Sequence, residues 1–162
     1  EVTRICLQDR VFYEGSGGGV TLSGGEPMMQ ADFAAELLHR LKQEGISTAI
    51  ETTGFAPASV FHRLMPDIDL YLFDCKQYDC QKHLAATGVP NDQILQNLKT
   101  ALQAGKDVIV RIPVIPGVNS SLEDAEGFCA VLRPLGAKRI NLLPFHQFCL
   151  SARSKDAVRF YA

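Results

Sequence analysis

The chain contains, at residues 16–27, the stretch SGGGVTLSGGEP. Its middle, residues 20–23, is a short apolar run typical of a buried strand. The Gly24-Gly25 pair that follows lets the backbone approach a ligand without interference from a Cβ atom. The carbonyls of this turn and the carboxylate of Glu26 are suited to accept hydrogen bonds from an ammonium group, whereas a plain strand-to-helix turn opened by the proline is the alternative interpretation. The stretch is neither a dinucleotide-binding fingerprint nor a P-loop, because it lacks GxGxxG and does not end in GK[ST].

Four more stretches share the features of buried parallel strands, being short, rich in Val, Ile, Leu or Phe, and closed by Gly, Pro or a polar cluster. They cover residues 48–52, 70–75, 108–114 and 140–143. Amphipathic helical patterns separate them, and this alternation predicts βα units and a parallel sheet, so the fold class is α/β. Residues 2–13 indicate one short helix. Because no strand precedes residue 20, we expect the sheet to begin in the middle of the fold.

Polar side chains follow almost every predicted strand at its C-terminal end. They are Ser23 and Glu26, Glu51 and Thr52, Asp74 and Lys76, Arg111, and His146. Period-two alternation places Asp74 and Lys76 on the same strand face as two leucines, which indicates a core that opens into a polar rim, where barrel enzymes hold their sites. An acid and a base are costly to bury unpaired, so they favour a ligand that is both cationic and anionic; a structural ion pair is the alternative. Arg111, in an otherwise apolar strand, favours a carboxylate or phosphate partner.

Length, charge and cysteine content argue against a nucleic-acid-binding, membrane-spanning or disulfide-rich protein. The chain has 162 residues, which suits one domain, and its 16 basic and 18 acidic residues give a charge of −2 without the basic surface that nucleic-acid binding needs. No apolar run reaches the ~18 residues of a membrane span. The five cysteines are odd in number and show no CxxC spacing, which argues against a disulfide framework and predicts a soluble, cytoplasmic protein. We expect His39, His62 and His83, which fall in helical or loop stretches, to be solvated.

Together these segments resemble the radical S-adenosylmethionine (SAM) enzymes, specifically the activating enzymes of glycyl radical enzymes, typified by pyruvate formate-lyase activase. The resemblance covers residues 9–146. Its landmarks are DRVFY at 9–13, SGGGVTLSGGEP at 16–27, ETTG at 51–54, FDCK at 73–76, TGVPND at 87–92, RIPVIPGVN at 111–119 and NLLPFHQF at 141–148. The SGGEP and RIPVIPG segments, in this order and spacing, are highly specific. The opening resembles the branch of the family with an additional ferredoxin-like cluster insert upstream.

The resemblance implies a partial (β/α)6 TIM-like barrel that binds SAM at its rim. In this family a 4Fe–4S cluster receives an electron from a donor such as flavodoxin and passes it to the sulfonium of SAM. The resulting 5′-deoxyadenosyl radical removes a hydrogen atom from a glycine of the partner, which is a glycyl radical enzyme. Matched by motif, Gly24, Gly25 and Glu26 would hold the methionyl ammonium, Lys76 and Arg111 would face the carboxylate, and Asp74 and His146 would contact the ribose and adenosyl end. Glu51, Thr52 and Asp74 match the positions of a monovalent cation site, with Glu51 in place of the more usual Asp.

Two departures from the family pattern change what we expect of this chain. The family's CxxxCxxC loop, whose three thiolates bind the cluster, precedes the GGEP segment, yet residues 1–23 contain only Cys6. After residue 148 the sequence CLSARSKDAVRFYA matches none of the family's usual continuation. We therefore predict an incomplete radical SAM core over residues 1–148, lacking its first strand–loop unit, and a divergent tail over residues 149–162. Such a chain has no catalytic residue of its own and is inactive when isolated.

Two alternative functions use the same residues. The missing cysteines favour a non-catalytic domain that binds SAM or docks on a partner protein. Lys76, at a strand end, could instead form a Schiff base as in class I aldolases, with Asp74 and Glu51 as acid and base. The aldolase hypothesis leaves the glycine turn and Glu26 unexplained.

Overall fold

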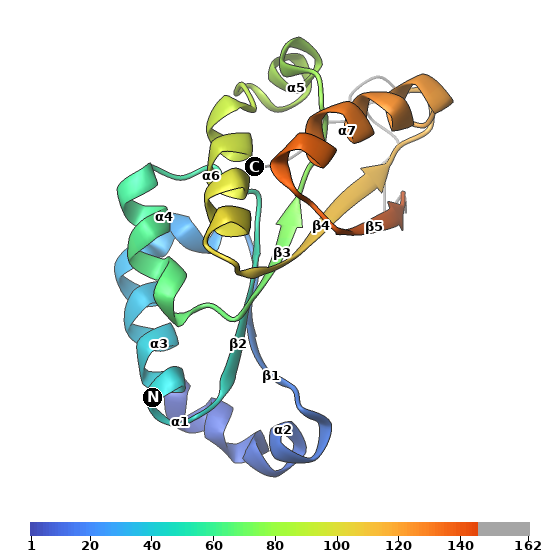
Figure 1. The fold of residues 1–162 in the computed structure, drawn as a ribbon. Helices are drawn as coiled ribbons and strands as arrows, with labels where there is room; N and C mark the ends of the chain where they lie inside the picture. The colour runs from blue at the N-terminus through green and yellow to red at the C-terminus, as the bar shows by residue number, and fades with distance from the viewer. Residues whose placement is uncertain (146–162) are drawn as a thin grey trace, which may run out of the picture.

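The computed structural model describes residues 1–145 and is organised around one parallel sheet of five strands (Figure 1). The strands are β1 (Gly19–Leu22), β2 (Ser47–Thr52), β3 (Leu70–Asp74), β4 (Asp107–Val114) and β5 (Arg139–Pro144). They lie in chain order across the sheet, and every neighbouring pair is parallel. The α/β class with a parallel sheet is therefore confirmed, and each strand lies within one residue of its predicted bounds.

Helices connect successive strands along one side of the sheet, and three short helical segments precede β1 (Figure 1). They are α1 (Val2–Cys6), η1 (Leu7–Asp9), α2 (Arg10–Ser16), η2 (Pro27–Gln30), α3 (Ala31–Gln43), α4 (Ala58–Leu64), η3 (Met65–Asp67), α5 (Cys80–Thr87), α6 (Asp92–Gln103) and α7 (Leu122–Leu135). When parallel strands follow one another in order, right-handed crossovers place every connecting helix on the same face. The other face of the sheet is left open to form the concave side of a partial barrel. None of the helices within residues 1–145 is long and apolar enough to cross a membrane.

The buried core lies between the helices and the sheet. Ile50, Tyr71, Phe73 and Val110 point from the strands toward the helices and are fully buried, and the Tyr71 ring stacks on Phe61 of α4 at a centroid distance of 5.6 Å. Because side chains alternate along a strand, residues 70, 72 and 74 of β3 point to the open face, where each is half-buried. The open face therefore carries the polar side chains toward the strand ends.

The single helix predicted over residues 2–13 is wrong. The chain forms α1 and α2, joined by the tighter turn η1, and the backbone at Asp9 leaves the helical region with φ −96° and ψ 12°. Cys6, Leu7 and Tyr13, on both sides of this break, pack against the core. Tertiary packing thus overrides a continuous helical pattern.

The prediction that His83 is solvated is also wrong, whereas His39 and His62 are exposed as predicted. His83 is 3% exposed, because its ring closes the end of α5. The ring Nδ1 lies 2.7 Å from the carbonyl oxygen of Val89 and 3.0 Å from the hydroxyl of Thr87. A histidine with a backbone carbonyl to bind can be buried without an ionic partner.

β5 forms one edge of the sheet among the described residues. Its side chains are mostly exposed, including Ile140 at 46% and Leu142 at 62%. β1 forms the opposite edge and pairs only with β2 within residues 1–145. Both edges keep backbone hydrogen-bonding groups on their outer sides.

The turn after β2 is held in place by a glycine and a buried asparagine. Gly54 has φ +71°, and a Cβ atom added there would lie 2.2 Å from the Phe73 ring. The amide of Asn97, which is 1% exposed in α6, donates to the carbonyls of Gly54 and Ala56, both at 2.8 Å. Backbone conformation, ring packing and hydrogen bonding therefore agree on one geometry for this turn.

We expect Gly54→Ala to lower the free energy of unfolding by about 3 kcal/mol, because it adds a steric clash with a core ring to the cost of a left-handed backbone. Gly45→Ala is the matched control, since Gly45 has φ +73° but open space around it. The control should lose only about 1 kcal/mol. Urea unfolding followed by circular dichroism measures both, and equal losses in the two variants would contradict the proposed contact.

Candidate functional site

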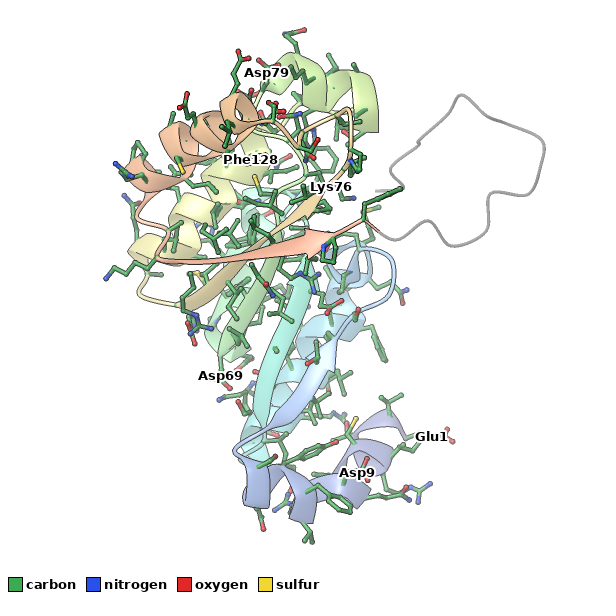
Figure 2. All side chains as sticks on the ribbon, turned by 90° about the vertical axis from the view of Figure 1, so that its right-hand side faces the viewer. Glu1, Asp9, Asp69, Lys76, Asp79 and Phe128 are labelled. Atoms are coloured by element: carbon green, nitrogen blue, oxygen red, sulfur yellow. The ribbon has the colours of Figure 1, made fainter. Side chains whose placement is uncertain are left out.

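The C-terminal ends of β1 to β4 border a cleft of about 230 Å³. Its lining contains every predicted site residue that the structure describes: Gly24, Gly25, Glu26, Glu51, Thr52, Asp74, Lys76 and Arg111, joined by Thr53. His146 lies outside the described residues. Figure 2 places Lys76 near the opposite end of the sheet from Asp69, which precedes β3. The structure therefore brings these residues together at one rim of the sheet.

The glycine turn after β1 is fixed by Glu26. Gly24 has φ +121°, a conformation that side chains rarely adopt, and open space surrounds the Cβ positions of both glycines. The Glu26 carboxylate accepts hydrogen bonds from the hydroxyl of Thr52 at 2.7 Å and from the backbone amide and hydroxyl of Thr53 at 2.9 and 2.8 Å. It also accepts from the amide of Met28 at the start of η2. Glu26 thus ties the turn to the end of β2, and the turn's backbone stays accessible.

Arg111, in β4, forms ion pairs with residues at the ends of β2 and β3. Its Nη1 lies 2.8 Å from Glu51 Oε1 on β2, and its Nε lies 2.7 Å from Asp74 Oδ1 on β3. Asp74 and Arg111 are direct neighbours in the parallel register. The hydroxyl of Ser23, just beyond β1, donates to the second oxygen of Glu51 at 2.6 Å. A structural ion pair therefore exists at the rim, and Asp74 makes it with Arg111.

Of the three residues predicted for a monovalent cation site, only two have side chains that lie close together. Glu51 and Asp74 face each other across the Arg111 guanidinium. Thr52 points to the other side of β2, where its hydroxyl binds Glu26 and accepts the amide hydrogen of Gly54 at 2.9 Å. The structure brings the two carboxylates together but does not bring the Thr52 side chain to them. The cation site stays a prediction.

Burial and hydrogen bonds set the charges in the cleft. The hydrogen bond from Ser23 and the pairing with Arg111 hold the pKa of Glu51 below its ordinary value, against the opposing effect of burial. Burial lowers the pKa of Lys76, while the nearby carboxylates of Asp74 and Glu26 oppose that shift. The cleft thus combines an ionised acid with a cation that is partly removed from water.

The described cysteines do not form a metal site. Cys75 is 2% exposed, and burial raises the pKa of its thiol to about 12, so it remains protonated at neutral pH. Cys80 donates its S–H to Asp92, and Cys6 and Cys129 lie on separate helices. Within residues 1–145 no group of three metal-binding side chains exists. An iron–sulfur cluster needs several convergent thiolates, so this part of the chain does not fit one.

Sequence reasoning missed the residues that hold the cleft residues, or the backbone beside them, through hydrogen bonds. These residues are Thr53 and the buried asparagines 91, 97 and 119, and the sequence motifs do not mark them as site residues. For Asn97 a signal existed, because it lies among Ile94, Leu98 and Ala101 on the buried side of α6. A polar residue within an apolar helical stripe indicates a specific buried partner.

We expect Ser23→Ala to raise the pKa of Glu51, because the largest favourable hydrogen bond to its carboxylate is lost. A carboxylate whose pKa is lower in the folded state stabilises the fold above its unfolded pKa, and that contribution is lost as pH falls through the folded pKa. In Ser23→Ala this contribution should be smaller, and its loss should be complete at a higher pH. Carboxyl ¹³C NMR titration measures the shift. Ser16→Ala is the control, since Ser16 donates to the carbonyl of Phe12 rather than to an acid; an unchanged Glu51 titration in Ser23→Ala would contradict the expectation.

Comparison with known proteins places these observations in a family. The model of the radical SAM superfamily matches residues 3–129. The choline trimethylamine-lyase activating enzyme of Oleidesulfovibrio alaskensis is 44% identical over 151 residues, which cover 91% of this chain and 49% of that protein. The pyruvate formate-lyase 2-activating enzyme of Escherichia coli is 44% identical over 145 residues, covering 90% of this chain and 50% of that protein. The chain thus spans about half the length of the curated relatives it matches.

A solved structure agrees in fold as well as in sequence. A domain of the pyruvate-formate lyase-activating enzyme from Bacteroides vulgatus superposes with a TM-score of 0.72 at 36% identity, over 80% of this chain and 81% of that domain. The predicted partial-barrel fold is confirmed by this match. The chain therefore belongs to the radical SAM superfamily, in the group of activating enzymes formed by these relatives.

Proposed function

We propose that this chain is the SAM-binding core of an enzyme that activates a glycyl radical enzyme. The observation that carries the proposal is the composition of the cleft, which combines an accessible glycine turn, two cations and three acids at one rim of the sheet. A ligand with an ammonium and a carboxylate on one carbon, such as the methionyl end of SAM, complements this arrangement. The names of the relatives supply the reaction class and the kind of partner.

Each lining residue has a proposed task in binding. Carbonyls of the Gly24-Gly25 turn accept hydrogen bonds from the ligand ammonium, and Glu26 keeps that turn in place. Lys76 and Arg111 face the ligand carboxylate. Asp74 and His146 contact the ribose and adenosyl end, and Glu51, Thr52 and Asp74 form the proposed cation position. When bound, SAM supplies the group from which this class of enzymes generates its hydrogen-abstracting radical.

The size of the cleft fits the methionyl end of this ligand. Sites that enclose a whole small molecule have volumes of about 300–1,000 Å³. The cleft of about 230 Å³ lies below that range and matches a smaller, charged portion of the ligand. The adenosyl end then extends beyond the cleft along the open face of the sheet.

The cofactor and partners of the whole protein enter as a separate part of the proposal. The described cysteines do not fit a 4Fe–4S cluster, so no step of the reaction is assigned to them. We propose that the cluster, the flavodoxin-like electron donor and the glycyl radical enzyme act with the whole protein, and that this chain binds SAM without cleaving it. The division into a core over residues 1–148 and a tail over residues 149–162, and a cytoplasmic location, stay predictions.

The two alternatives differ in their support. A non-catalytic, SAM-binding domain agrees with the same cleft and with the arrangement of the cysteines. One observation favours the aldolase hypothesis: Lys76 is half-buried with a lowered pKa, and lysines whose pKa is lowered by burial can form Schiff bases. However, Asp74 and Glu51 are both paired with Arg111, which leaves neither poised as a general acid.

Lys76→Met should weaken SAM binding by at least about tenfold, because it removes a cation from the proposed carboxylate position. The matched control is Lys42→Met, since Lys42 pairs with Asp69 at the other end of the sheet. Isothermal titration calorimetry of the three proteins measures the affinities, and the control should bind like the unchanged chain. Equal affinity in all three would contradict the assignment of Lys76, and the absence of binding to the unchanged chain would contradict the proposed function.

After anaerobic reconstitution with iron and sulfide and addition of a strong reductant, we expect this chain to release no 5′-deoxyadenosine from SAM. The reason is the lack of convergent thiolates among the described residues. Chromatography of the reaction mixture and the visible absorption spectrum provide the measurement. Release of 5′-deoxyadenosine together with an iron–sulfur spectrum would show that cysteines of this chain bind a cluster.

A further inference from the structure

A buried asparagine, Asn119, forms a hydrogen bond with the backbone of Lys76. Asn119, in the loop between β4 and α7, is 4% exposed. Its amide nitrogen donates to the carbonyl of Lys76 at 3.2 Å and to that of Pro113 at 2.9 Å, and its Oδ1 accepts the amide hydrogen of Ile115 at 2.7 Å. Both amide hydrogens and the oxygen of this side chain are therefore used, each on a different backbone group.

The position of Asn119 coincides with the end of a strand ladder. The amide of Cys75 donates to the carbonyl of Arg111 at 2.9 Å, which continues the pairing of β3 with β4. In a parallel ladder the next donor on β4 belongs to residue 113, but Pro113 has no N–H. The direct pairing of β3 with β4 therefore stops just before Lys76. The Asn119 amide supplies the next hydrogen-bonded connection between the two strands.

The carbonyls that follow Lys76 are held in the same way. Asn91, which is 3% exposed, donates from its amide nitrogen to the carbonyl of Gln77 at 3.1 Å and to that of Tyr78 at 3.0 Å. Three successive carbonyls after β3 are thus bound by side-chain amides that are almost fully buried. A flexible lysine gains a defined location only when its backbone is fixed, because its side chain has several rotatable bonds.

From this geometry we propose that Asn119 is a positioning residue for Lys76. By fixing the Lys76 carbonyl against the end of β4, it sets where the Lys76 ammonium enters the cleft and so contributes to recognition of the ligand carboxylate. The inference rests on the proposed function of the cleft. A purely structural role would instead stabilise the loop after β4 without affecting any one part of the ligand.

Two ligands distinguish positioning from stability. Decarboxylated SAM lacks only the carboxylate, so a residue that acts through Lys76 should affect SAM and leave the decarboxylated compound unaffected. Four variants are compared by calorimetry: Asn119→Ala, Lys76→Met, the double variant, and Thr48→Val. Thr48 is the control because it is 1% exposed and its hydroxyl donates to the carbonyl of Asp67 at 2.6 Å, at the other end of the sheet.

We expect Asn119→Ala to weaken SAM binding by roughly fivefold and to leave binding of the decarboxylated compound within about twofold. Thr48→Val should change neither affinity. The double variant should bind SAM no more weakly than Lys76→Met alone, because both substitutions act on the same interaction. Should Asn119→Ala fail to fold, Asn119→Ser carries the same comparison, since its hydroxyl can still donate to one carbonyl.

Each other outcome overturns a specific statement. Equal weakening for both ligands in Asn119→Ala, or unchanged affinity for both, would overturn the positioning role. Additive losses in the double variant would show that Asn119 acts independently of Lys76. If the unchanged chain binds neither ligand, the proposed function of the cleft fails, which is distinct from a failure of the inference about Asn119.

Discussion

The guanidinium of Arg111 between Glu51 and Asp74 is the interaction on which the site depends. Two carboxylates on neighbouring strands, each only partly exposed, would repel one another without a cation between them. The planar guanidinium can donate to both acids at once, which a lysine ammonium on a flexible stem does less well. Through Ser23 the same group of side chains reaches the end of β1. One guanidinium on β4 thus binds the ends of β2 and β3 directly and is linked, through Glu51 and Ser23, to the residue after β1.

This arrangement also determines what a ligand must replace. A carboxylate that approaches Arg111 competes with two acids already bound to it, so ligand binding exchanges ion pairs rather than creating one in empty space. Burial disfavours the charged form of Lys76, the carboxylates of Asp74 and Glu26 oppose that effect, and a ligand carboxylate would oppose it further.

The sequence predicted the sheet and the rim well, because both follow from short-range rules. Apolar runs closed by glycine, proline or polar residues located the strands, and the polar residues at strand ends located the cleft. The partners of these residues could not be predicted, because they depend on register between strands distant in sequence. Asp74 pairs with Arg111 since β3 and β4 are aligned there, and Thr52 binds Glu26 since alternation turns it away from Glu51. The burial of His83 depends on the path of the loop that supplies its carbonyl partner.

The order of the strands has a consequence for how such a protein can change over evolution. In a sheet assembled in chain order, the outer sides of β1 and β5 are the places where another strand–helix unit can be added without crossing any existing connection. The cleft is lined by residues of β2 to β4 and of the turns that follow β1, β2 and β3, and none of these residues lies in β5. The architecture is therefore modular: units can be gained or exchanged at either edge while the ligand-contacting part keeps its geometry.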